Sequence, residues 1–303
     1  MTTQKNQKLA LIYGCVTVLL WSTVATVFKI ALTELTPLQL VTGACFVSML
    51  VLFSRVWMSG QLSQVLKTLK QRPLFYLTLG ALNPTAFYLS LFAGYEHLPG
   101  SIAVPVNYSW AVMLPLLAAP VLKQALSRWQ LLGCLMGYGG VTIIATGGKL
   151  SGLGDINLVG IGLVLLAALI WCLYWIMNTG NKQDPVVSLL CCTLCGFPML
   201  LILNMAFGSW PEVGIHGIAG MIYIGLFEMG VTYIFWLTAL RIATEASRVS
   251  NLMFLVPVLS IMWISVFLGE KIDSSIWMGM ALILSGVGIP QLIERYRLSA
   301  QAA

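Results

Sequence analysis

The chain has 303 residues, of which 59% are hydrophobic and 9% are charged. Soluble domains usually contain about 45 to 50% apolar and about 25% charged residues, so this composition excludes an ordinary soluble domain and indicates an integral membrane protein. The formal net charge of +6 would favour anionic partners in a soluble protein. Here we attribute it to an excess of positive residues in the loops on one side of a membrane.

Apolar segments of bilayer length follow one another along the chain. A helix needs roughly 20 apolar residues to cross about 30 Å of hydrocarbon. The segments cover residues 9–31, 37–57, 73–95, 100–122, 127–147, 157–178, 185–207, 216–240, 246–268 and 275–294. Such long continuous runs exclude a barrel of short alternating strands. We therefore predict an all-α integral membrane protein with ten transmembrane helices.

Lysine and arginine are distributed unequally between the predicted loops. If the N-terminus is cytoplasmic, thirteen of the sixteen lie on the inner side, and only Lys149 and Lys271 lie on the outer side. Lys29 falls within the first segment. Cytoplasmic loops of membrane proteins carry this excess of positive charge. The pattern predicts that both termini are cytoplasmic and that the protein is a multi-pass protein of the bacterial inner membrane.

The two halves of the chain repeat one another. Residues 127–146 resemble residues 273–292 at a constant spacing of 146. Each half has five segments, and an odd number of crossings inserts the second copy upside down. We predict a five-helix repeat over 1–147, an outside linker over 148–156 and an inverted five-helix repeat over 157–303, together forming one transport domain. Inverted repeats in a membrane indicate transport.

Small residues recur at helical spacing in the last segment of each half. Gly133 and Gly137 are four apart in segment five, and Ala281 and Ser285 are four apart in segment ten. Small side chains let two membrane helices approach closely. We predict that segments five and ten form the interface between the halves, with ligand-facing segments elsewhere.

Glu228 lies near the middle of segment eight, and Asn83 occupies the equivalent position of segment three, 145 residues earlier. A carboxylate at that depth costs several kcal/mol unless it is protonated, paired or wet, so it is a functional candidate. Pro84 follows Asn83, and Gly230 lies close behind Glu228; both residue types weaken helices. Paired interrupted helices indicate a central binding site. The alternative is a neutral, hydrogen-bonded structural acid.

Aromatic and amide side chains form a second group of candidates for contact with substrate. Segment six carries four of them on one helical face, and segments one and four carry the others. They are Trp171, Tyr174, Trp175 and Asn178 in segment six, Trp21 in segment one, and Asn107, Tyr108 and Trp110 in segment four. This lining would suit a flat, partly apolar substrate. Aromatic packing in the core is the alternative for any one of them.

Two charged positions near the outer side have competing interpretations. Lys29 lies about four residues from the end of its span, so it either extends to the surface or meets a carboxylate in a cavity, where it would take part in charge coupling with Glu228. We interpret Glu270 and Lys271 as a solvated pair in the turn between segments nine and ten.

These motifs resemble an EamA-type member of the drug/metabolite transporter superfamily. The resemblance covers essentially the whole chain, through Trp21-Ser22 with Lys29, Thr36-Pro37, Pro257-Val258 and Leu268-Gly269-Glu270-Lys271. Asn107-Tyr108-Ser109-Trp110 further resembles the Asn-Tyr-x-Trp-Pro stretch of the aromatic amino-acid exporter group exemplified by YddG. Two positions differ, because Ala111 replaces the proline and Gln124 stands where the first half often has an acid. The resemblance implies an inner-membrane exporter of small metabolites.

The sequence therefore predicts a secondary active transporter that exports small amphipathic metabolites, such as aromatic amino acids, by alternating access. A multidrug or organic-cation exporter and a facilitative uniporter are alternatives, and a scaffold or receptor is a distant one. An enzyme would need a nucleophile with its base or a metal cluster at membrane depth, and neither pattern occurs. We expect no cofactor or metal, and no nucleic acid. The expected partners are a small molecule, the bilayer and, if transport is coupled, protons.

Overall fold

The computed structural model describes residues 5–122, 128–148, 157–179, 181–208, 213–245, 248–249 and 252–302, and these residues form helices and turns without a strand. The first half contains α1 (Gln7–Ala31), α2 (Pro37–Met58), α3 (Leu62–Gln71), α4 (Pro73–Gly80), η1 (Ala81–Ala86), α5 (Phe87–His97), α6 (Gly100–Asn107), α7 (Trp110–Leu122) and α8 (Arg128–Ala145). The second half contains α9 (Leu158–Thr179), α10 (Pro185–Phe207), α11 (Ile215–Phe227), α12 (Val231–Ile242), η3 (Leu252–Phe254), α14 (Leu255–Leu268) and α15 (Ser274–Ala302). The predicted all-α class is confirmed.

Seven helical stretches of the described residues are long and apolar enough to cross a membrane. They are Gln7–Ala31, Pro37–Met58, Pro73–His97, Gly100–Val121, Leu158–Asn178, Pro185–Phe207 and Ile215–Ile242. The apolar helices Leu252–Leu268 and Ser274–Pro290 are shorter. With α8, which packs along α15, these elements occupy the places of the ten predicted spans. The ten-span inverted topology itself stays a prediction.

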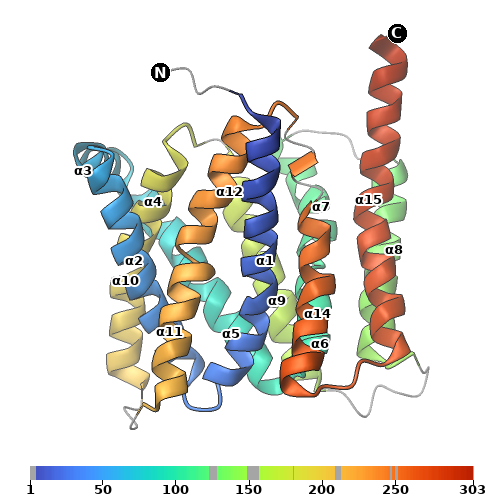
Figure 1. The fold of residues 1–303 in the computed structure, drawn as a ribbon, viewed down its shortest axis with the longest axis horizontal. Helices are drawn as coiled ribbons and strands as arrows, with labels where there is room; N and C mark the ends of the chain where they lie inside the picture. Colours follow the sequence, from blue (N-terminus) through green and yellow to red (C-terminus); the bar gives the residue numbers. More distant parts are fainter. Residues whose placement is uncertain are drawn as a thin grey trace.

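The long helices lie side by side, and α1 begins at the same end of the molecule at which α15 ends (Figure 1). We call this the inner end and the opposite one the outer end. An even number of crossings is needed to bring both termini to one end. The inner end is the predicted cytoplasmic side.

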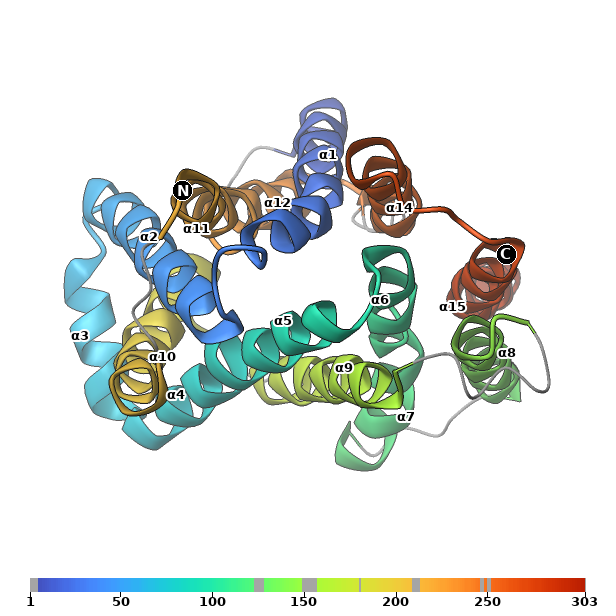
Figure 2. The same ribbon diagram turned by 90° about the horizontal axis from the view of Figure 1, so that it is seen from below.

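Helices of each half pack against helices of the other half. Helix α1 packs against α11, α12 and α14 of the second half, while α9 packs against α5, α6 and α7 of the first half (Figure 2). Helix α2 packs against α10, and each of them also contacts the interrupted helix of the opposite half. Side chains from both halves therefore meet around the middle of the molecule.

Helices α8 and α15 form a close pair at one edge of the molecule, as predicted for segments five and ten (Figure 1). Of the four small residues predicted at this interface, Gly133 lies at a point of closest approach, and the other such points are at Gly140, Gly279 and Gly286. Gly133 lies against the backbone of Gly286, and Gly140 lies against the backbone of Gly279. Gly137 instead faces Val112 of α7. Glycine is needed at Gly133 and Gly140 because a Cβ there would collide with a carbonyl oxygen of α15.

Two long helices are interrupted at the positions that the sequence predicts. The first breaks at Asn83, whose φ of −142° and ψ of 117° are extended, just before Pro84. The second breaks between Phe227, where α11 ends, and Val231, where α12 begins. Proline lacks the amide that a helix needs, and glycine lowers helix stability. Both interruptions leave backbone groups to be satisfied by other partners.

At the outer end, two carboxylates link neighbouring helices through hydrogen bonds. Glu34 accepts hydrogen bonds from the amide of Gly217 and from His216 at the start of α11. Glu270 accepts hydrogen bonds of 3.0 and 2.9 Å from the amides of Gly100 and Ser101 at the start of α6. The interpretation of Glu270 as a solvated pair with Lys271 is therefore wrong. Helix N-termini leave amides unpaired, and a carboxylate satisfies them.

Part of the predicted organisation lies outside the described residues. These parts are residues 149–156 of the predicted linker and Gln124. Helix α3, an amphipathic helix beside the inner end of α2, occupies the loop after segment two.

The α8–α15 contact gives a stability test with a control on the same helix. In Gly133→Ala the new Cβ meets the carbonyl oxygen of Gly286, and overpacking of this kind costs about 1–3 kcal/mol. A Cβ at Gly139 meets nothing within 4 Å, so Gly139→Ala should be neutral or stabilising by about 0.5–1 kcal/mol. Thermal unfolding in detergent should give a lower midpoint for Gly133→Ala alone. Equal midpoints would contradict the close approach.

The contact of Glu34 with α11 should depend on pH. The pKa of the Glu34 carboxyl is lowered, first by the hydrogen bond from the Gly217 amide and then by His216. A lowered pKa means that the contact stabilises the fold above the unfolded-state pKa and is lost as the pH falls through the folded-state pKa. Glu34→Gln should lower the thermal midpoint at neutral pH, and the two proteins should converge in acid. A difference that stays constant with pH would show that the charge is not the cause.

Candidate functional site

The two interruptions place Glu228 beside side chains of the other half. Glu228 caps the end of α11, and the hydroxyl of Tyr88 from α5 donates a hydrogen bond of 3.0 Å to its Oε1. Trp21 of α1 donates from Nε1 to the backbone oxygen of Glu228 at 3.3 Å. The carboxylate and the peptide of one residue are thus held by two different helices of the first half.

The other free carbonyls of this interruption are also satisfied by side chains. Ser48 of α2 donates to the oxygen of Met229 at 2.8 Å, and Thr232 donates to the oxygen of Phe227 at 2.6 Å. Unpaired backbone groups are costly in a membrane, so an interrupted helix persists only where such partners exist. The break at Glu228 is therefore held in place by α1, α2 and its own α12.

A small cavity lies between the two interruptions, and we call it the central cavity. Asn83 and Pro84 border it from one interruption and Met229 from the other. The remaining lining residues are Leu52, Tyr88, Leu189, Cys192, Thr193 and Tyr233. The cavity thus brings the predicted position Asn83 next to Tyr88, the residue that holds Glu228.

Tyr88 and Tyr233 are functional candidates that the sequence analysis missed. They are 145 residues apart, the same spacing as Asn83 and Glu228, so each half places a tyrosine five residues after its central polar residue. Tyr233 lies beside Tyr88 and makes an edge contact with the ring of Trp21 at a centroid distance of 5.3 Å. Applying the same spacing of 145 residues five positions further along each half would have found both.

Three buried polar atoms at breaks between helices have no hydrogen-bond partner among the described residues. They are Oδ1 of Asn83, Oδ1 of Asn107 and Oγ of Ser109. Asn83 is only 6% exposed. Asn107 and Ser109 flank the break between α6 and α7. Buried polar groups are nearly always paired, so these atoms are suited to meeting polar groups of a substrate or water.

The three aromatic candidates of α9 lie together, whereas its amide candidate lies nearer the inner end. Tyr174 lies beside Asn83, and Trp171 stacks on Tyr174 at a centroid distance of 5.7 Å. Trp175 makes an edge contact with Trp171. Asn178 instead accepts a hydrogen bond from Asn181 in a separate polar cluster. The continuous stripe predicted along α9 therefore faces two different surroundings.

The other predicted residues differ in whether they lie near Glu228. Tyr108, directly after α6, and Tyr95 of α5 are both close enough to interact electrostatically with the Glu228 carboxylate. Trp110 is half-buried at the start of α7, where its carbonyl accepts from Cys172. Lys29 donates to the carbonyls of Tyr95 and Leu98 at 2.8 and 3.0 Å, so it binds the end of α5. A role in charge coupling stays a prediction for Lys29.

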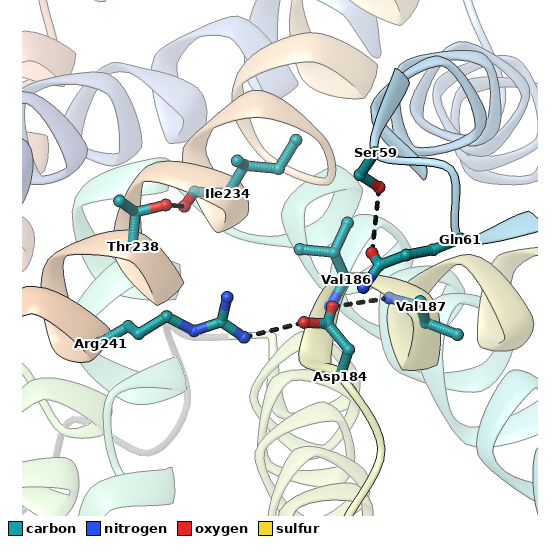
Figure 3. A network of polar contacts seen from close by, with 8 residues as sticks. All are labelled: Ser59, Gln61, Asp184, Val186, Val187, Ile234, Thr238 and Arg241. Carbon is teal, nitrogen blue, oxygen red and sulfur yellow. Dashed lines mark hydrogen bonds and ion pairs between the residues drawn. The ribbon is translucent and has the colours of Figure 1, made fainter. Parts of the chain in front are cut away.

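A larger cavity lies toward the inner end, and we call it the inner cavity. It is bordered by the end of α2, the start of α10 and α12 (Figure 3). Its lining residues are Arg55, Ser59, Gln61, Asp184, Pro185, Val186, Ile234, Leu237, Thr238 and Arg241. From the sequence alone, its arginines are interpreted only as positive charges of the inner loops.

An ion pair lies at the edge of the inner cavity. Arg241 Nη2 lies 2.8 Å from Asp184 Oδ2, while Oδ1 of Asp184 accepts from the amides of Val186 and Val187 at the start of α10 (Figure 3). Burial favours the neutral acid, but the hydrogen bonds from Arg241 and from these amides outweigh it, and the pKa of Asp184 is lowered. Asp184 is therefore an ionised cap that also links α10 to α12.

The chain is similar in sequence to bacterial proteins, several of which are named as transporters. It is 26% identical to the uncharacterized transporter YvbV of Bacillus subtilis over 72% of each chain. It is 24% identical to an uncharacterized transporter of Synechocystis over 93% of this chain and 89% of that one. Protein PecM of Dickeya dadantii is 23% identical over 72% of this chain and 73% of that one.

A solved crystal structure of a protein with 20% sequence identity matches 96% of this chain and 99% of its own, with a TM-score of 0.67, which shows the fold. The profile of the EamA-like transporter family matches residues 8–146 and 158–289. Together with its long apolar helices, this match makes the protein a multi-pass membrane protein, of the inner membrane in bacteria, and a transporter rather than an enzyme. The chain belongs to the EamA-like transporter family.

Proposed function

We propose that the protein is a secondary active transporter that exports small amphipathic metabolites, aromatic amino acids among them, by alternating access. The observation that carries this proposal is the contact between Glu228, at the break of one half, and Tyr88 of the other half. Transporters of inverted architecture bind substrates or coupling ions at interrupted helices where the two repeats meet, and Glu228 is a carboxylate at such an interruption.

The α8–α15 contact supports an inverted arrangement of the halves. Gly133 and Gly279 are equivalent under the repeat spacing of 146, and so are Gly140 and Gly286. Gly133 meets Gly286, whereas Gly140 meets Gly279, so equivalent residues make reciprocal contacts. Reciprocal contacts of this kind are those of a two-fold related pair.

The residues around the central cavity have complementary roles in this proposal. The Glu228 carboxylate binds the ammonium of an amino acid or exchanges a proton. The unpaired Oδ1 of Asn83 accepts a hydrogen bond from the same substrate. The rings of Trp21, Tyr174 and Tyr233 pack against its side chain, since aromatic rings favour offset or edge contacts with one another. The direction of transport follows from the family resemblance.

Export of organic cations is the second candidate function. A single carboxylate near the rings of Trp21 and Tyr233 also suits a cation without a carboxylate, because aromatic faces attract positive charge. A counterflow screen of amino acids and organic cations in proteoliposomes, with and without a pH gradient, separates these candidates. A flux that ignores the pH gradient would favour a facilitative uniporter.

Removal of the Glu228 charge tests the coupling role. A hydrogen bond to a charged group is worth about 1.5–3 kcal/mol, so Glu228→Gln should reduce counterflow at least about tenfold and remove its dependence on the pH gradient. Glu245→Gln is the matched control, because Glu245 lies at the inner end and pairs with Arg248. Wild-type flux and pH dependence in a folded Glu228→Gln protein would refute the role.

Tyr88→Phe tests whether the hydrogen bond across the halves serves transport. It removes the donor to Glu228 and should reduce flux about three- to tenfold, the range expected for one hydrogen bond. Tyr223→Phe loses a comparable hydroxyl contact, with Thr23 at 2.7 Å, outside the central cavity and should retain flux. In the double variant Tyr88→Phe/Glu228→Gln the effects should not add, because the two residues act on one contact. Additive losses would count against the contact.

A further inference from the structure

The inner cavity carries an arginine that the ion pair does not use. Its charged lining consists of Arg55, Arg241 and Asp184. Arg241 is paired with Asp184 at 2.8 Å, whereas none of the described residues pairs with the guanidinium of Arg55. One positive charge of the lining is therefore unbalanced. An unpaired guanidinium at the wall of a cavity is suited to binding an oxyanion, which it can hold with two parallel hydrogen bonds.

The inner and central cavities follow one another along the same three helices. On each helix, a residue that lines one cavity lies three or four positions from a residue that lines the other: Leu52 and Arg55 on α2, Val186 and Leu189 on α10, and Tyr233 and Leu237 on α12. Residues at this spacing share one helix face and lie about one turn apart. The two cavities therefore lie about one helical turn apart along α2, α10 and α12, with the inner cavity toward the inner end and the central cavity toward the residues that hold Glu228.

We propose that the inner cavity is an entry site, in which Arg55 binds the carboxylate of a zwitterionic substrate before its ammonium reaches Glu228. This inference rests on the proposed function and specifies the substrate class as amino acids rather than simple cations.

The composition of the cavity wall fits a zwitterion with an apolar side chain. Asp184 repels a second carboxylate but attracts an ammonium, so the wall contains one partner for each charge of an amino acid. Pro185, Val186, Ile234 and Leu237 supply apolar surface between these groups. Arg241 is 56% exposed and Asp184 is 18% exposed, so their ion pair lies partly in solvent at the edge of the cavity. Partly solvated pairs contribute little stability, about 0–1 kcal/mol, so an arriving ligand can replace this one.

L-phenylalanine and phenethylamine test the proposal because they share a ring and an ammonium and differ by the carboxylate. In proteoliposome counterflow, Arg55→Gln should raise the KM for phenylalanine about tenfold, equivalent to about 1.4 kcal/mol. The KM for phenethylamine should stay within about twofold of the wild-type value, because that amine has no group for Arg55. Arg55→Lys keeps the charge but loses the paired hydrogen bonds, so it should restore part of the affinity for phenylalanine.

Arg248→Gln is the control for loss of a positive charge at the inner end. Arg248 pairs with Glu245 and does not line the cavity. This variant should leave both KM values unchanged. Thermal unfolding in detergent shows whether each variant is folded, and Arg55→Lys provides the test if Arg55→Gln does not fold.

The outcomes separate this inference from the proposed function. If the wild-type protein carries neither probe nor any other amino acid or cation, the proposed function fails and the inference fails with it. If it carries both probes and Arg55→Gln changes their KM values equally, or if it carries only phenethylamine, the inference alone fails. Vesicles of phosphatidylcholine with and without phosphatidylglycerol give the last comparison. A phenylalanine effect confined to the anionic vesicles would assign the cavity to a lipid phosphate and overturn the proposal.

Discussion

The central site depends on the pairing of backbone groups where a membrane helix is interrupted. Lipid offers no hydrogen bonds, so each carbonyl released by the break after Phe227 needs a partner within the protein. Those partners are Trp21 of α1, Ser48 of α2 and Thr232 of α12. The orientation of Glu228 is thus a consequence of how α1 and α2 pack against the second half. Substitutions in either helix can affect the site without touching the carboxylate.

The two halves supply similar positions but different chemistry. Tyr88 and Tyr233 are equivalent and lie side by side, whereas the residues five positions before them are Asn83 and Glu228. One half therefore contributes a neutral amide and the other a carboxylate. A symmetric scaffold with a single charge has a defined electrostatic polarity, and a zwitterion or cation would bind it in one orientation.

The contacts at the two ends differ in kind. At the outer end, Lys29 binds carbonyls at the end of α5, and Glu34 and Glu270 bind amides at helix starts. At the inner end, α10 and α12 are joined through the ion pair of Asp184 and Arg241 beside a cavity. Alternating access requires contacts at the two ends to form and break in turn. The inner ion pair joins two side chains, one of them 56% exposed, so a change of side-chain conformation can break it, whereas the outer contacts join side chains to backbone groups of helix ends.

The sequence alone was sufficient for the membrane class, the helical segments and the two interruptions, since each follows from local composition or from the residues Pro84 and Gly230. It also placed the close helix contact on segments five and ten, through the spacing of small residues. The specific pairs, Gly133 with Gly286 and Gly140 with Gly279, depended on how α8 and α15 cross, which no periodicity encodes. The same holds for the contact of Tyr88 with Glu228, the role of Glu270 at the start of α6, and the inner cavity. These features join residues far apart in the chain, and only the tertiary packing of the helices determines which side chains meet.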